Sequence, residues 1–351
     1  MTHLTYLEAA VVGLIQGVSE MFPVSSLGHN VLLPAIVGGS WARDLNVAAS
    51  ESPYLAFIVG LHVATAIALL VYFRRDWVRI IGGFFSSIRD RGVVTDDQRL
   101  AWMIVLATIP VGIVGLAFEH AFRVIFGKPV FAGIFLAVNG VILIAGERHR
   151  TRASLAADAA IAAERGPGLT VPAREPELSA TTRQPELAVS ARRPEPAGAG
   201  RHRSAGHAAR PPEVPDAVRS DRRLASMGYP QAVVIGSAQI LALLAGISRD
   251  GVAIVAGMGR GLSREDAARF AFLLATPVIL AAGALKVPDL LGSLGNGIRG
   301  QILLGSVLSG IGAYLSVRFL LRYLRTRTLT PFGVYCLIAG LASVAYLGLI
   351  K

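Results

Sequence analysis

The chain has 351 residues, of which 53% are hydrophobic and only 16% charged, and its formal net charge is +11. Its mean hydropathy of +0.55 is too high for an ordinary soluble protein. Its single cysteine, Cys336, excludes a disulfide framework, a cysteine-based zinc site and a Cys-x-x-Cys redox motif. We therefore expect an all-α polytopic membrane protein.

Six uncharged apolar runs predict six transmembrane helices, because each is long enough to cross or nearly cross a bilayer. They are residues 54–73, 101–118, 129–146, 270–285, 301–317 and 329–350.

Two further apolar stretches, residues 9–38 and 230–262, are interrupted by polar and helix-breaking residues. The first contains Glu20, Pro23 and a Ser-Ser-Leu-Gly-His run, and the second a Gly-Ile-Ser-Arg-Asp-Gly run. Broken polar backbone at membrane depth is tolerated only where protein or a water-filled cavity surrounds it. Both stretches are therefore predicted to be re-entrant helix-loop-helix hairpins.

Residues 147–228 differ in composition from the membrane halves on either side, residues 1–146 and 229–351. Half of the chain's 18 prolines lie here, with many Arg, Ala and Glu residues and no aromatic one. Such a segment cannot form a packed core, so we predict a disordered insert.

Basic residues mark one side of the predicted topology. They concentrate in residues 74–99, 148–223, 260–269 and 318–327. The positive-inside rule places these segments, and with them the insert, in the cytoplasm. We therefore expect both termini to face outward, the first hairpin to enter from outside and the second from the cytoplasm, and no nucleic-acid binding.

The two hairpins resemble each other. A shift of 223 residues superposes Gly13 on Gly236, Gln16 on Gln239, Ser25 on Ser248 and Gly28 on Gly251. These positions are polar or glycine, which an apolar composition alone does not favour. Because the hairpins are expected to enter from opposite sides, the match predicts an inverted-topology repeat with a site near the midplane.

Polar groups of the first hairpin favour phosphate binding. Pro23 ends one helix, Ser25 or Ser26 caps the next, and His29 follows one turn later on the same face. Hydroxyls, an imidazole and free backbone N–H groups at a helix N-terminus suit an anion. Glu20 is a carboxylate within a membrane segment, so it needs a partner or a function. A capping serine, an interior histidine and a structural counter-ion remain the alternatives.

The second hairpin offers a cation. Glycines provide the turn, Ser248 caps a helix, and Arg249 can fork onto a phosphate. Alternatively, Arg249 forms a structural ion pair with Asp250 or Glu20.

Two other polar positions are not assigned to the site. His62, alone in its apolar run, is expected to be a hydrogen-bonded interior histidine, with a place lining the site as the alternative. The run Ser263-Arg264-Glu265-Asp266 is expected to be an N-cap with acidic first-turn residues.

Together these groups predict a site for a phosphate ester or anhydride with a lipid tail. Hydrolysis needs an activated nucleophile, either Ser26 primed by His29 or a water primed by His29 or Glu20. Arg249 and backbone N–H groups would stabilise the phosphoryl charge, and the carboxylate could hold a divalent cation.

Residues 16–29, 246–251 and 262–265 resemble the motifs of the bacitracin-resistance type undecaprenyl-diphosphate phosphatases, and the resemblance covers nearly all of the chain outside the insert. Members are bacterial plasma (inner) membrane enzymes that hydrolyse undecaprenyl diphosphate to the monophosphate carrier lipid of peptidoglycan synthesis. The resemblance implies a polyprenyl diphosphate substrate, a Mg²⁺ or Ca²⁺ cofactor, a role in bacitracin resistance and a site open to the outer face.

The resemblance also implies roles for individual residues. The catalytic candidates are Ser26, His29, Glu20 and Arg249, with Ser26 and His29 as the favoured pair. The candidate metal ligands are Glu20 and Gln16. The candidate substrate-binding residues are Gln16, Ser25, Gly28, Gly246, Ser248 and Gly251.

The chain departs from the family motifs at four positions, Leu27, Ala245, Ile247 and Asp250. Lost hydroxyls and an added acid beside Arg249 predict weaker or altered anion binding. The alternatives are a polyprenyl-phosphate transporter or flippase of the same architecture and a phosphatase for a different lipid phosphate. Lipid chain length, the metal and the oligomeric state, a homodimer included, stay open.

Overall fold

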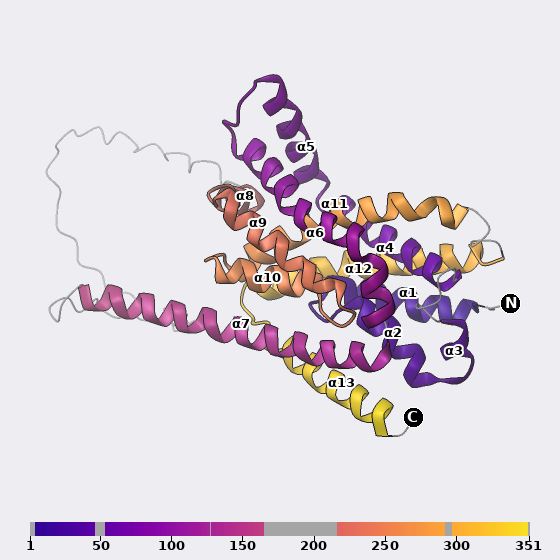
Figure 1. Cartoon of the computed structure of the whole chain (residues 1–351). Coiled ribbons are helices and arrows are strands. Elements are labelled where there is room, and N and C mark those ends of the chain that lie inside the picture. The colour runs from indigo at the N-terminus through magenta and orange to yellow at the C-terminus, as the bar shows by residue number, and fades with distance from the viewer. Residues whose placement is uncertain (1–3, 46–52, 127, 165–215, 292–296, 350–351) are drawn as a thin grey trace, which may run out of the picture. The chain divides into compact units, whose positions relative to one another are not determined.

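The computed structural model describes residues 4–45, 53–126, 128–164, 216–291 and 297–349 (Figure 1). These residues form helices and connecting turns, with no strand among them. The chain divides into one compact unit of residues 1–154 and 216–351 and a second unit of residues 155–215. All contacts described below lie within the first unit. The all-α prediction is confirmed for the described residues.

Among the described residues, five helices contain a segment long and apolar enough to cross a membrane on its own. They are α6 (Asp96–Phe126), α7 (Pro129–Glu164), α11 (Arg264–Leu291), α12 (Arg299–Leu324) and α13 (Thr330–Leu349). A sixth is available if α4 (Pro53–Tyr72) is counted together with α5 (Arg74–Arg89), from which it is bent by 86°. The six predicted spans therefore correspond to five or six helices of sufficient length.

The two interrupted stretches each form a helix, a break and a second helix. In the first, α1 (Tyr6–Met21) precedes α2 (Ser26–Val37), which the short α3 (Gly39–Asp44) follows. In the second, α9 (Tyr229–Ala238) continues into the 3₁₀ helix η1 (Gln239–Leu243), and α10 (Arg249–Gly259) follows the break.

Matched residues of the repeat cap matched helices. The Ser25 hydroxyl accepts a hydrogen bond from the Gly28 backbone N–H at 3.2 Å, and the Ser248 hydroxyl accepts one from the Gly251 N–H at 3.1 Å. The breaks thus begin their second helices in the same way, as expected of two copies. They differ at Ser25, whose φ of 66° is a left-handed conformation that favours glycine.

Small residues let several helices approach closely. A Cβ added to Gly13 of α1 would lie 2.5 Å from the Gly305 carbonyl oxygen of α12. A Cβ added to Gly140 of α7 would lie equally close, at 2.5 Å, to the Gly333 carbonyl oxygen of α13. Such contacts are the usual basis of helix association in membranes, where no hydrophobic force drives it.

Charged side chains connect α5, α6, α8 (Asp216–Ala225) and α11. Arg79 of α5 pairs with Asp97 at the start of α6, at 3.2 Å, and with Asp221 of α8. Arg269, near the start of α11, pairs with Asp221 at 2.9 Å and with Asp76 at 3.1 Å. Arg79 also pairs with Asp76 at 2.7 Å. The two cations therefore share the buried acids Asp76 and Asp221, and Asp97 adds the fourth helix.

A second set of contacts brings further helix ends to the same region. Arg264 of α11 pairs with Glu147 of α7, and this carboxylate also accepts the Leu329 backbone N–H, 3.1 Å away, just before α13. Arg325, which follows α12, pairs with Glu265 at 2.9 Å. The basic segments predicted to share one side of the membrane therefore do lie together.

The ends of the predicted insert are helical rather than disordered. Helix α7 continues to Glu164, and α8 forms over Asp216–Ala225. Helix α8 packs against the other helices through Asp221 and Leu224, which are buried. The average composition of residues 147–228 gives no sign of this packing. The remaining residues of the predicted insert, 165–215, lie outside the described part of the chain.

Candidate active site

Glu20 joins the two hairpins. This buried carboxylate lies in the last turn of α1, and its Oε1 accepts a hydrogen bond from Nη2 of Arg249, 2.5 Å away, in the first turn of α10. Its Oε2 accepts from the hydroxyl of Ser26 and from Nε2 of Gln16, the latter at 3.0 Å. Four residues predicted for the site are thus in direct contact, and one carboxylate connects the breaks of both hairpins.

His62 of α4 also belongs to this cluster. Its Nε2 lies 3.4 Å from Oε2 of Glu20, and its Nδ1 lies 2.8 Å from the Ile58 carbonyl oxygen. The bond to Ile58 agrees with the favoured interpretation of a hydrogen-bonded histidine, and the contact with Glu20 agrees with the alternative of a place at the site. A lone histidine in an apolar run gives no sign of which helix it will face.

Two asparagines complete the polar interior, and neither was predicted. Asn30 donates to Oε1 of Gln16 at 2.7 Å. Asn139 of α7 donates to the Pro23 carbonyl oxygen at 2.9 Å and accepts the Ser248 backbone N–H at 3.0 Å, so one amide holds both breaks. Asn139 could have been suspected, because it is the one amide within an otherwise apolar run, residues 129–146.

The glycines assigned to substrate binding have a packing role. A Cβ on Gly28 would lie 2.9 Å from the Gly246 Cα, so the two breaks touch backbone to backbone. Gly246 has a φ of 114°, which a side chain would strain. A Cβ on Gly251 would lie 3.3 Å from the Pro23 Cβ. These contacts explain why glycine is needed here without reference to a ligand.

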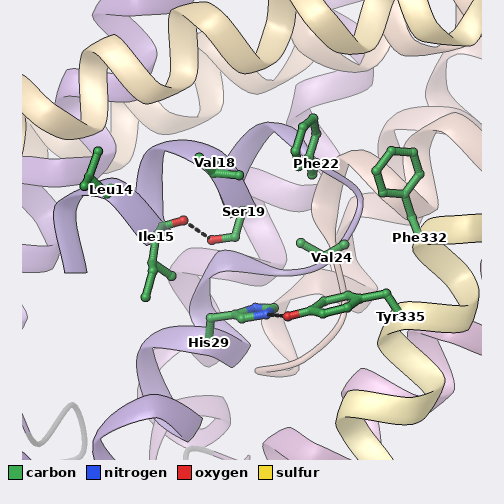
Figure 2. A pocket seen from close by; sticks show the side chains of 9 residues that line it. All are labelled: Leu14, Ile15, Val18, Ser19, Phe22, Val24, His29, Phe332 and Tyr335. Atoms are coloured by element: carbon green, nitrogen blue, oxygen red, sulfur yellow. Dashed lines mark hydrogen bonds between the residues drawn. The ribbon is translucent and has the colours of Figure 1, made fainter. Parts of the chain in front are cut away.

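His29 faces away from Ser26 in its hydrogen bonding. Its Nδ1 lies 2.7 Å from the Ser25 carbonyl oxygen, and its Nε2 lies 2.7 Å from the hydroxyl of Tyr335 on α13 (Figure 2). In the described part of the chain the Ser26 hydroxyl instead donates to Glu20. The shared helix face predicted for Ser26 and His29 therefore does not produce a hydrogen-bonded pair.

An apolar groove of about 440 Å³ lies beside His29, between α1, α2 and α13 (Figure 2). It is lined by Leu14, Ile15, Val18, Ser19, Phe22, Val24, His29, Phe332 and Tyr335. His29 is the residue that belongs both to this groove and to the predicted catalytic set.

Asp250, one of the departures from the family motif, is a buried acid. Neither of its carboxylate oxygens has a hydrogen-bond partner in the described part of the chain, and Oδ1 lies 3.6 Å from Nε of Arg249. Arg249 thus lies between two acids, Glu20 and Asp250, as the alternative of a structural ion pair anticipated.

The residues around Glu20 suit a divalent cation that protein and substrate hold together better than one that protein side chains hold alone. Among the described residues, no group of three or more His, Cys, Asp or Glu side chains could hold a metal ion. Glu20 supplies a carboxylate and Gln16 an amide oxygen, which are hard oxygen donors. Mg²⁺ commonly binds through one or two carboxylates together with substrate phosphates, so this donor set fits such a cation.

Comparison with known proteins supports the same family. A family model described as bacitracin resistance protein BacA matches residues 9–166 and 207–342. An undecaprenyl-diphosphatase from Mycolicibacterium paratuberculosis is 55% identical over 99% of both chains. Undecaprenyl-diphosphatase 2 of Frankia alni is 54% identical over 97% of both chains, and that of Burkholderia lata is 38% identical over 93% of this chain and 91% of its own. The chain therefore belongs to the bacitracin resistance protein BacA family.

Proposed function

We propose that this multi-pass membrane protein hydrolyses undecaprenyl diphosphate to undecaprenyl phosphate and inorganic phosphate, and so returns the carrier lipid to cell-wall synthesis. The observation that carries the proposal is the contact of Glu20 with both Ser26 and Arg249 across the two hairpins. A base, a hydroxyl and a permanent cation within one buried cluster are the groups that phosphoryl transfer requires.

Arg249 is the phosphate-binding residue of this mechanism. Its guanidinium bonds Glu20 through Nη2, and it can present its remaining N–H groups to a phosphate. The helices α2 and α10 both begin at the cluster, so their first backbone N–H groups add to the attraction for an anion.

Glu20 is the general base. The Ser26 hydroxyl already donates to Glu20, so the carboxylate can take this proton as the oxygen attacks the terminal phosphorus. The bond between that phosphorus and the bridging oxygen then breaks, and undecaprenyl phosphate leaves. Water hydrolyses the phosphoserine in a second step.

A water activated by Glu20 is the other nucleophile that fits, and it would complete hydrolysis in one step. Acid quenching with substrate labelled on its terminal phosphate separates the two routes. Label retained on protein, and lost in Ser26→Ala, indicates attack by Ser26, whereas unlabelled protein during turnover indicates water.

A divalent cation, Mg²⁺ or Ca²⁺, would be held by Glu20 and Gln16 together with the diphosphate, and it would neutralise phosphate charge. Gln16 then turns its Oε1 from Asn30, from which this atom accepts a hydrogen bond. Removing the cation with a chelator is expected to abolish turnover and leave the helical fold intact.

We also infer the arrangement in the bacterial plasma membrane. The helix ends joined through Arg79, Arg264 and Arg325 face the cytoplasm, because they carry the basic segments. The hairpins are then re-entrant, related by inverted topology, and the site opens to the outer face. Cysteines placed in residues 165–215 should react with a membrane-impermeant reagent only after permeabilisation, and labelling in intact cells would reverse this orientation.

The function is tested with the purified full chain in proteoliposomes containing C55 polyprenyl diphosphate. We expect inorganic phosphate to be released in a cation-dependent reaction. Movement of intact lipid between leaflets without phosphate release would instead support the transporter alternative. Phosphate release from a different lipid phosphate, and not from C55 polyprenyl diphosphate, would show that the enzyme has another substrate.

A further inference from the structure

The apolar groove of Figure 2 has the character of a binding site for a hydrocarbon chain. Its volume of about 440 Å³ lies within the range of roughly 300–1,000 Å³ typical of ligand sites. Most of its lining side chains are aliphatic or phenylalanine. Among the polar ones, the Ser19 hydroxyl donates to the Ile15 carbonyl oxygen at 2.5 Å and is satisfied within its own helix.

Continuity with the candidate site identifies the occupant. A polyprenyl diphosphate carries its first isoprenoid unit directly on the diphosphate, so the phosphate site must adjoin an apolar surface. The groove reaches the break of the first hairpin, because Phe22 and Val24 in its wall flank Pro23 and His29 follows Ser26 by three residues in α2. A second groove, between α4 and α12, is also apolar but is lined by none of the predicted site residues, and Tyr314 stands in its wall.

Tyr335 fixes the orientation of His29. A carbonyl oxygen can only accept, so Nδ1 of His29 carries the proton that bonds the Ser25 oxygen. In the neutral ring, Nε2 is then an acceptor, and the Tyr335 hydroxyl donates to it at 2.7 Å. The two rings are also nearly parallel, with an interplanar angle of 5° and centroids 5.8 Å apart. The rings therefore lie edge to edge across the hydrogen bond, and two hydrogen bonds hold the imidazole.

We propose that Tyr335 is a positioning residue for His29, and that the groove takes the isoprenoid units next to the diphosphate. The proposal rests on the proposed function and adds to it a tail site and a residue from α13. Tyr335 acts through His29: it fixes the ring of this candidate catalytic residue at the wall of the groove, three residues along α2 from Ser26.

The positioning role is tested with Tyr335→Phe, which keeps the ring and removes the hydroxyl. The matched control is Tyr314→Phe, which makes the same change in the wall of the other groove. With C55 polyprenyl diphosphate, kcat per folded protein should fall by about tenfold in Tyr335→Phe, the value of one hydrogen bond, with KM unchanged. Tyr314→Phe should match the wild type in both constants. A wild-type kcat in Tyr335→Phe, or a loss explained by its folded fraction, would overturn the positioning role.

The tail site is tested without turnover. The probe is a farnesyl diphosphate that carries a photoreactive diazirine on its first isoprenoid unit, used with the wild-type chain. We expect cross-links in peptides of α1 and α13 that contain Leu14, Val18 or Phe332, and their loss when unlabelled lipid competes. Cross-links confined to α4 and α12 would contradict the groove assignment. Absence of phosphate release by the wild type would contradict the proposed function, while the cross-links would still decide the tail site.

Discussion

At the scale of single residues, we expect the ion pair between Glu20 and Arg249 to contribute to stability as well as to the proposed reaction. In Glu20→Ala the part-buried guanidinium of Arg249 loses the acceptor at 2.5 Å, and we expect a loss of about 3 kcal/mol in the free energy of unfolding. The double variant Glu20→Ala/Arg249→Ala should be less destabilised than the sum of the single variants. Unfolding in detergent measures all four proteins, and strictly additive losses would show that the pair does not couple.

Asp250 gives a second prediction at this scale. Its buried carboxylate has no hydrogen-bond partner in the described part of the chain and lies near Arg249. Asp250→Ser should therefore stabilise the protein by about 1–3 kcal/mol, the cost of an unsatisfied buried polar group, and raise phosphate release. Asp90→Ser, at an exposed position, is the control. A fall in both quantities would mean that Asp250 supports the site rather than competing for Arg249.

The sequence predicted the residues of the cluster better than their pairing. Glu20, Ser26 and Arg249 stand out because charged or polar groups within membrane segments need partners. The spacing of Ser26 and His29 suggested that they act together, whereas His29 bonds Tyr335, which is 306 residues away in the chain. Contacts of this kind depend on how α2 packs against α13, and no local pattern contains that information.

At the scale of elements, small residues set the distance between helices. In Gly17→Ala the added methyl group would overlap the Ser309 carbonyl oxygen of α12. We expect overpacking to cost about 1–3 kcal/mol in the free energy of unfolding and to move Glu20, which lies on the same helix. In Gly112→Ala of α6 the added Cβ meets no heavy atom within 4 Å, so stability should not fall. Equal stability of the two variants would contradict the close packing of α1 and α12.

The positions of the helices could largely be predicted from the sequence, because uninterrupted apolar length is a strong signal. The expected runs 101–118 and 301–317 lie inside α6 (Asp96–Phe126) and α12 (Arg299–Leu324), which are longer at both ends. Charged residues extend these helices beyond the apolar core and were excluded from the runs. Helix α8 was missed because its ten residues carry few apolar side chains, and its stability comes from acids paired to other helices.

At the scale of the whole molecule, Asp221 connects α8, at the end of the predicted insert, to α5 and α11. Asp221→Asn removes the charge that Arg79 and Arg269 share, and we expect a loss of about 3 kcal/mol or more in the free energy of unfolding. Asp90→Asn, whose pair with Arg89 is exposed, should change it by less than about 0.5 kcal/mol. If both variants unfold alike, α8 is not held by its buried acid.

The whole molecule is expected to act as a catalyst in which two hairpins meet at Glu20 and Arg249 to hydrolyse a lipid diphosphate. The most direct measurement is inorganic phosphate release from C55 polyprenyl diphosphate by the purified wild type, beside Arg249→Ala and the exposed control Arg89→Ala. We predict rapid release with Mg²⁺ or Ca²⁺ by the wild type and by Arg89→Ala, no release after chelation, and a loss of at least about 100-fold in Arg249→Ala. Undiminished release by folded Arg249→Ala would contradict the account.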